Sequence, residues 1–279
     1  MTGPAPAEPR GRLLAARTGN TLGALLLFVA FSACLAAQKA ELDPHTAQPQ
    51  RPTVATHAGT VARGWLELES GIESDRYDDS TRGALVPVLA KLGLSPRLQL
   101  EVQTPAVWAP GEGGAGLGDL SVGIKWRFLE NAPTVGDLAI LPSIKMPTGS
   151  SSLDTGTGTT DVGVLFISSH ELGPVAIDVN VGYTRRSGDG TLTPRNAFLW
   201  TGSFSGPARG PLGWVAELYS YPATSGPVGD PSIVAFLAGS TLMIRPWLVV
   251  DAGVILPITG PQPKAVYAGA VYNVARVWR

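Results

Sequence analysis

The sequence predicts an all-β protein: a closed antiparallel transmembrane β-barrel of about twelve strands, preceded by a signal peptide. Three observations lead to this prediction. Segments of about 10–14 residues alternate apolar with polar or small residues. The connections between these segments are alternately long and short. Most tryptophans lie near the predicted strand ends.

The composition is that of a folded chain without a marked charge. Of the 279 residues, 44% are hydrophobic and only 15% are charged, which excludes a solvated, disordered chain. The net charge is −1, so nothing in the composition indicates nucleic acid as a partner. The single cysteine, Cys34, excludes an internal disulfide framework, and three scattered histidines do not indicate a metal site. We therefore predict no metal and no other cofactor.

The amino terminus has the three parts of a secretory signal peptide. Arg10, Arg12 and Arg17 precede an uncharged apolar stretch, and small residues follow at 33–37. We predict a signal peptide over 1–37 and export to the bacterial outer membrane. One alternative is a retained anchor, since the stretch is just long enough to span a bilayer. Another is lipidation of Cys34, although Phe31 replaces the branched aliphatic residue of a lipoprotein signal.

Residues 38–61 show no apolar period. We predict a flexible lead-in there, and the barrel domain over 62–279. After the signal peptide no apolar run approaches the roughly 18 residues that a transmembrane helix needs. The barrel domain is therefore expected to cross a membrane only with strands.

Alternation with period two supports the strands. Within 119–128, for example, Lys125 and Arg127 share one face while Trp126 and Phe128 share the other. The other clear segments are 97–104, 137–146 and 175–186. A soluble sandwich would give the same alternation, so the connections and the tryptophans have to decide between the two folds.

The connections alternate as they do in outer-membrane barrels. The odd-numbered connections are mostly long and the even-numbered ones mostly tight, which is typical of outer loops and periplasmic turns respectively. An even number of strands leaves both termini on the short-turn side. The predicted strands are 62–73, 81–92, 96–107, 117–129, 135–147, 158–170, 174–186, 196–206, 211–222, 231–244, 246–259 and 264–277.

Tryptophans gather near the predicted strand ends. Trp108 ends a strand on the long-loop side, and only Trp200 is central. Indole rings prefer the boundary between membrane and water, which this placement would satisfy. The remaining five lie on the short-turn side: Trp65, Trp126, Trp214, Trp247 and Trp278.

Two prolines do not fit a regular ladder. Pro87 and Pro142 fall inside predicted strands, and a proline has no N–H to donate. We expect a β-bulge at each, or strand boundaries several residues away from those predicted.

Three stretches resemble those of a known family. They are GLGDLSVGIKW at 116–126, PSIKMPTG at 142–149 and GTTDVG at 158–163. In this order they are similar to the "MetA-pathway of phenol degradation" group of outer-membrane proteins, over about residues 62–279. The resemblance implies a transporter-like outer-membrane barrel that takes up small hydrophobic or aromatic molecules. It also implies that the family pattern allows a proline at Pro142, and it supplies no substrate-contacting residues.

The last predicted strand is similar to the barrel-assembly signal of outer-membrane proteins. Gly269, Tyr272 and Val274 carry this similarity, and Arg279 at the end departs from it. The expected partners are therefore membrane lipid and, during biogenesis, the barrel-assembly machinery.

The inward faces are predicted to carry ionisable residues of both signs. A lumen of one sign would indicate ion selectivity, and a mixed one does not. Buried charge is costly without a partner, so we expect these groups to pair across strands. We predict one polar network on the inner wall, formed by Asp119, Lys125, Asp137, Lys145, Asp161 and Asp178.

Three functions remain open. The leading one is passive transport, provided that neither the loops nor the lead-in plug the lumen. The second is a structural or adhesive barrel without a pore. The third is a lipid hydrolase that uses His170 with Ser168 or Ser169. Adjacent residues of a strand point to opposite faces, so we predict that the protein is not an enzyme.

Overall fold

The computed structural model describes residues 43–188, 194–222 and 232–278. The predicted signal peptide, Cys34 and the first residues of the predicted lead-in lie outside the described residues. Within these ranges no helix is long and apolar enough to cross a bilayer.

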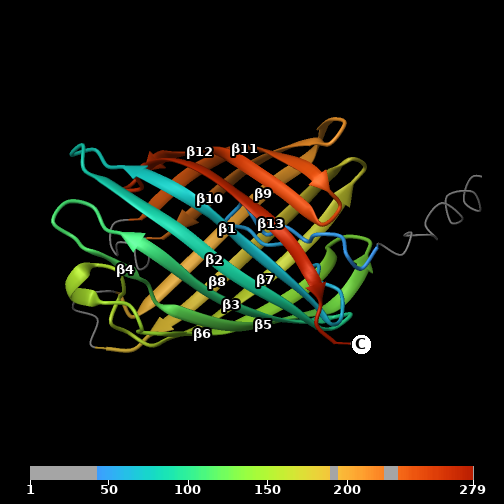
Figure 1. Cartoon of the computed structure of the whole chain (residues 1–279), viewed down its shortest axis with the longest axis horizontal. Coiled ribbons are helices and arrows are strands. Elements are labelled where there is room, and N and C mark those ends of the chain that lie inside the picture. Colours follow the sequence, from blue (N-terminus) through green and yellow to red (C-terminus); the bar gives the residue numbers. More distant parts are fainter. Residues whose placement is uncertain (1–42, 189–193, 223–231, 279) are drawn as a thin grey trace, which may run out of the picture. The chain divides into compact units, whose positions relative to one another are not determined.

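In the part of the chain that the structure describes, twelve long strands form one antiparallel sheet that closes on itself (Figure 1). Consecutive long strands pair with each other, and β1 also pairs with β13, which completes the ring. The predicted closed barrel is therefore confirmed. A short strand, β4 (Ala115–Leu117), pairs with the end of β3. The long strands are β1 (Trp65–Arg76), β2 (Arg82–Ser95), β3 (Leu98–Trp108), β5 (Leu120–Ala132), β6 (Gly136–Met146), β7 (Asp161–Leu172), β8 (Val175–Arg186), β9 (Asn196–Arg209), β10 (Leu212–Tyr221), β11 (Ile233–Arg245), β12 (Leu248–Thr259) and β13 (Lys264–Arg276).

The barrel is apolar outside, and its buried charged side chains point inside. Phe166 and Val181 are each 54% exposed, whereas Glu67, Lys91 and Lys125 are fully buried. Because successive side chains of a strand point to opposite faces, these two sets line opposite surfaces of the same sheet. A soluble sandwich would show the reverse arrangement, so this pattern is that of a barrel whose outer surface faces lipid.

The connections divide into two classes at the two ends of the barrel. At one end the turns are short, at 96–97, 133–135, 173–174, 210–211 and 246–247. At the other end, which we call the loop side, the connections are longer. Two of them are 109–119 and 147–160, and the second contains a short 3-10 helix, η1 (Ser151–Leu153). β1 starts and β13 ends on the short-turn side, as predicted from the even strand number.

Both problematic prolines lie inside strands, and neither needs a bulge. Pro87 has no paired residue in β1, and Pro142 has none in β5. On their other sides Pro87 faces Pro105 and Pro142 faces Val164, in unshifted register. A proline cannot donate to the ladder, and the sheet accommodates each one by omitting pairs on one side. The expected bulges and displaced boundaries are therefore wrong.

The tryptophan pattern is only partly as predicted. Trp65 begins β1, Trp108 ends β3, and Trp247 directly precedes β12. Trp126, predicted to close a strand, lies well inside β5, because that strand continues to Ala132. It is half exposed on the outer surface, where an apolar ring can contact lipid.

Candidate functional site

The lumen contains a segment of the chain itself. Residues 43–64, which we call the lumen segment, precede β1 and run within the outline of the barrel (Figure 1, blue). We predicted a flexible lead-in over most of this range, but the structure fixes it to the wall. The reason is that an extended chain without secondary structure of its own must find acceptors for its buried N–H groups, and the wall provides them.

Eight backbone N–H groups of the lumen segment donate to six side chains on five different strands. The acceptors are carboxylates, amide oxygens and one hydroxyl. The bonds are Gln48 to Glu67 (2.8 Å), Gln50 to Glu69 (2.9 Å), Arg51 to Glu69 (3.0 Å), Val54 and Ala55 to Glu217 (2.8 and 2.6 Å), Thr56 to Asn180 (2.7 Å), Ala58 to Ser169 (2.7 Å) and Val61 to Gln99 (2.7 Å).

The lumen segment enters and leaves on the short-turn side. Near its start, the His45 ring stacks on Trp65 and Trp247, with ring centroids 4.5 and 5.9 Å away. Near its end, the hydroxyl of Thr60 donates to the carbonyl of Pro96 in the first short turn, at 2.9 Å. Between these points it crosses to β10 and β12, so it occupies the short-turn half of the lumen.

A cluster of buried charges lies beside this segment. The Lys91 ammonium contacts Glu67, 2.6 Å from Oε1, and also Glu69. The Lys125 ammonium lies 3.4 Å from Oε1 of Glu101. We call these five residues the central ion cluster. Lys125 also donates to the hydroxyl of Thr56 (3.0 Å) and to the carbonyl of His57 (3.1 Å). The lumen segment thus provides two further acceptors for the Lys125 ammonium.

Three of the six predicted network residues meet on the loop side. Lys145 lies 2.6 Å from Asp119 and 3.1 Å from Asp161, and Arg186 lies 3.7 Å from Asp161. Burial acts to raise the pKa of Asp119. Hydrogen bonds from Lys145 and from the N–H of Thr157 outweigh it and hold this pKa below its ordinary value.

The other three predicted residues lie elsewhere. Lys125 belongs to the central ion cluster, Asp137 contacts Arg127 at 3.7 Å near a short turn, and Asp178 accepts a hydrogen bond from Ser169 at 2.5 Å. The structure therefore does not join the six in one network. Asp137 and Lys145 share a face of β6, but at roughly 3.4 Å per residue they stand at opposite ends of the strand.

The sequence prediction missed most residues that hold the lumen segment. The predicted polar network does not include the following five buried residues: Glu67, Glu69, Lys91, Glu217 and Asp251. A signal existed, because the inward carboxylates outnumber the inward cations on the same strands. Such an excess of acceptors requires donors from another part of the chain.

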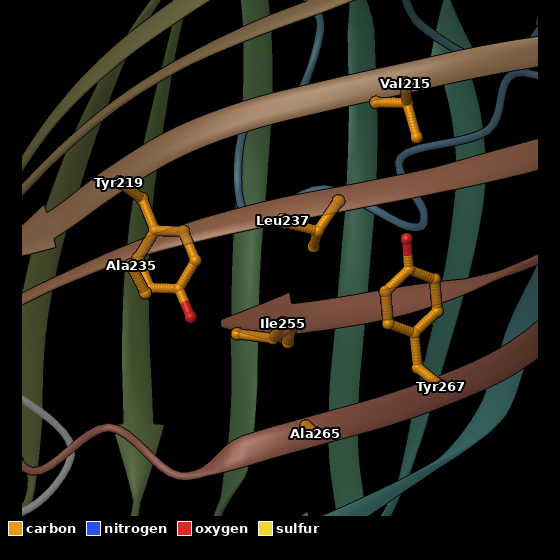
Figure 2. Packing of buried hydrophobic residues seen from close by; sticks show 7 residues of the cluster. All are labelled: Val215, Tyr219, Ala235, Leu237, Ile255, Ala265 and Tyr267. Atoms are coloured by element: carbon orange, nitrogen blue, oxygen red, sulfur yellow. The ribbon is translucent and has the colours of Figure 1, made fainter. Parts of the chain in front are cut away.

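The inner wall of β10–β13 differs from the rest of the lumen. Figure 2 shows apolar and aromatic side chains gathered there, and Val54 of the lumen segment packs against them. Tyr219 and Tyr221 extend this surface toward the loop side, with ring centroids 6.1 Å apart. We call the following residues the apolar wall: Val215, Tyr219, Ala235, Leu237, Ile255, Ala265 and Tyr267.

The residues of the hydrolase alternative do not converge. The hydroxyl of Ser169 points inward, donates to Asp178 and accepts from the N–H of Ala58. His170 is the next residue of β7 and therefore lies on the opposite face of the sheet.

Comparisons with known proteins agree with this fold. A family model described as "Putative MetA-pathway of phenol degradation" matches residues 50–256. The chain belongs to this family. The match confirms the family resemblance seen in the three sequence motifs.

Solved structures show the same barrel as this MetA-pathway family member. One is the COG4313 outer membrane channel from Pseudomonas putida F1, with 12% identity and a TM-score of 0.63, over 79% of this chain and 99% of that chain. Another is the KdgM porin in complex with disordered oligogalacturonate, with 9% identity and a TM-score of 0.50, over 74% and 99% of the two chains. No curated protein matches the chain. At these identities the likeness shows an outer-membrane β-barrel fold, shared with channels and porins.

Docking of the lumen segment in this family member is expected to weaken in acid. Burial, followed by the charges of Lys125 and Lys91, lowers the pKa of His57 from 6.5 to about 3. Because the docked state binds fewer protons than the released state, docking is strongest above pH 6.5. It then weakens as the pH falls toward 3, by at most about 1.4 kcal/mol per pH unit.

A spin label at Thr60→Cys, in a chain without Cys34, would report this release as increased label mobility at low pH. Replacement of His57 by Gln provides the matched control, because glutamine does not titrate. If the label responds to acid equally in both proteins, His57 does not govern docking.

Proposed function

We propose that this protein is a passive channel of the bacterial outer membrane for small hydrophobic or aromatic compounds. The apolar wall is the observation that carries the proposal. It places two tyrosines and several aliphatic side chains on one side of a lumen whose buried ion pairs lie mainly on other strands. An interior that needed only to be filled or hydrated has no requirement for such a one-sided surface.

The chemistry of the apolar wall suits a flat apolar solute. Tyr219 and Tyr267 offer ring faces and edges, against which an aromatic solute packs favourably. On the other side of the lumen the loop-side cluster of Asp119, Lys145 and Asp161 can bind the polar group of such a solute. A compound with one apolar and one polar end would therefore be oriented as it enters from the loop side.

The lumen segment lies in the path that a transported solute would take. It occupies the short-turn half of the lumen and is held by the backbone hydrogen bonds described above, so a solute has to pass beside it or displace it. The same observation favours the second candidate function, a structural barrel without a pore. The two functions differ in whether a solute crosses the segment.

Dye uptake by intact cells distinguishes the two functions. We expect cells that produce the protein to take up N-phenyl-naphthylamine, an apolar aromatic dye, severalfold faster than cells without it. Tyr219→Ser should reduce this rate, because it removes an aromatic ring from the apolar wall. Leu165→Ser, an inward residue of β7 outside the apolar wall, is the matched control and should have little effect. Uptake equal to that of cells without the protein would support the structural barrel.

A further inference from the structure

A recess of the barrel wall, which we call the receptor, holds one planar cation inside the lumen. The Arg51 guanidinium donates to Asp251 through two nitrogens, Nε at 3.2 Å and Nη2 at 3.1 Å. The Asp251 side chain is only 2% exposed and that of Arg51 is 15% exposed. Two parallel N–H···O bonds between a guanidinium and a carboxylate are directional, which a single ammonium contact is not.

Two glycines form the floor of this receptor. Gly71 of β1 and Gly269 of β13 face each other across the strands that close the barrel. A Cβ atom on Gly269 would lie 2.5 Å from both Nε and Nη2 of Arg51, and one on Gly71 would lie 2.6 Å from Nη2. The guanidinium plane therefore lies directly against the backbone, in a slot that any side chain at Gly269 would fill.

The surroundings of the receptor favour a positive ligand. Glu69 and Glu73 stand on the same face of β1 as Gly71, one residue pair to either side. Lys91, the nearest cation of β2, is already paired with Glu67 and Glu69. Without Arg51, the buried carboxylate of Asp251 would have no ion pair within the described part of the chain.

We propose that Asp251, Gly71 and Gly269 form a binding site for the guanidinium or amidinium group of a small solute. Arg51 fills this site while the lumen segment is docked, and so acts as a tethered competitor of that solute. A ligand that takes the place of Arg51 removes one of the contacts that hold the segment against β12. Binding of such a cation and release of this part of the segment are thus coupled.

The tether determines how the site behaves in the native protein. A side chain on a short linker has an effective concentration of about millimolar near its own site. A free guanidinium compound therefore has to compete with Arg51 and binds weakly. Replacing Arg51 by alanine vacates the site and leaves the slot and the carboxylate in place.

Titration calorimetry with methylguanidinium and methylammonium tests the proposal on the full-length protein in detergent. We expect Arg51→Ala to bind methylguanidinium at least about tenfold more tightly than the unchanged protein, equivalent to about 1.4 kcal/mol. The same variant should prefer methylguanidinium over methylammonium. Adding Asp251→Asn, which keeps the shape but removes the charge, should abolish binding. Adding Gly269→Ala instead should weaken it by filling the slot.

Two results would overturn the proposal. One is equal binding of methylguanidinium to Arg51→Ala and to Arg51→Ala/Asp251→Asn, and the other is equal affinity for the two cations. Retention of the heat-dependent shift in gel mobility verifies that each barrel is folded, and Arg51→Gln provides a second vacated site if the alanine variant is not. Because the readout is equilibrium binding, a barrel that transports no aromatic solute can still bind methylguanidinium, and the failures of the two proposals remain distinguishable.

Discussion

Replacement of Lys91 by methionine is expected to destabilise the barrel by about 3–5 kcal/mol, because it leaves buried carboxylates without their cation. Lys91 is fully buried and contacts both Glu67 and Glu69. Methionine has a similar length, so the loss reflects charge rather than a cavity. Urea-induced unfolding in lipid vesicles, followed by tryptophan fluorescence, would measure the change.

Two further variants separate the electrostatic effect of Lys91 from a general effect of substitution. Lys264→Met changes an exposed lysine at the start of β13 and should alter stability by no more than about 0.5 kcal/mol. Adding Glu69→Gln to Lys91→Met should recover part of the loss, because it removes one unpaired charge. A Lys91→Met barrel as stable as the Lys264→Met barrel would show that the central ion cluster is not required for stability.

Deletion of residues 43–61 is expected to raise the single-channel conductance severalfold and to make the channel prefer cations. The deletion exposes an excess of inward carboxylates, six against two ammonium groups among the charges that contact the segment or its direct partners. A lumen of one predominant charge selects ions of the opposite sign. The acids are Glu67, Glu69, Glu101, Asp178, Glu217 and Asp251, and the bases are Lys91 and Lys125.

Planar-bilayer recordings in a potassium chloride gradient would give both quantities, the conductance from the current steps and the preference from the reversal potential. A synthetic peptide of residues 43–61, added on the short-turn side, should bind in the vacated lumen and reduce the conductance. An unchanged conductance, or a preference for anions, would contradict the view that this segment is the main obstruction in the lumen.

The sequence predicted the barrel well because its signals are local and repeated. Alternation such as that of Lys125 and Trp126 in β5 indicates which side of the strand faces lipid. Each tight turn fixes the register between the two strands that it joins. The prolines were misjudged for a related reason. Pro87 and Pro142 break a local rule, but a closed sheet can omit two successive pairs on one side of a strand without losing its register.

The interior of the lumen could not be predicted in the same way. Residues 43–64 show no hydrophobic periodicity, because they form neither helix nor strand. The eight backbone N–H groups described above donate to side chains 18 to 163 residues away. Pairing between inward charges depends on the position of each residue along the barrel axis as well as on the face of the strand. For this reason Asp119, Lys145 and Asp161 meet, while Asp137, on the same face of β6, does not join them.

The lumen segment also has a mechanical consequence. Strand ladders resist sliding of neighbours, but a thin cylinder wall can still flatten across its diameter. The segment contacts Glu69 on one side of the barrel, and Glu217 and Asn180 on the other. It therefore links distant parts of the wall across the lumen. The cross-section of the barrel is thus held from within, and any event that frees the segment also frees the wall to change its shape.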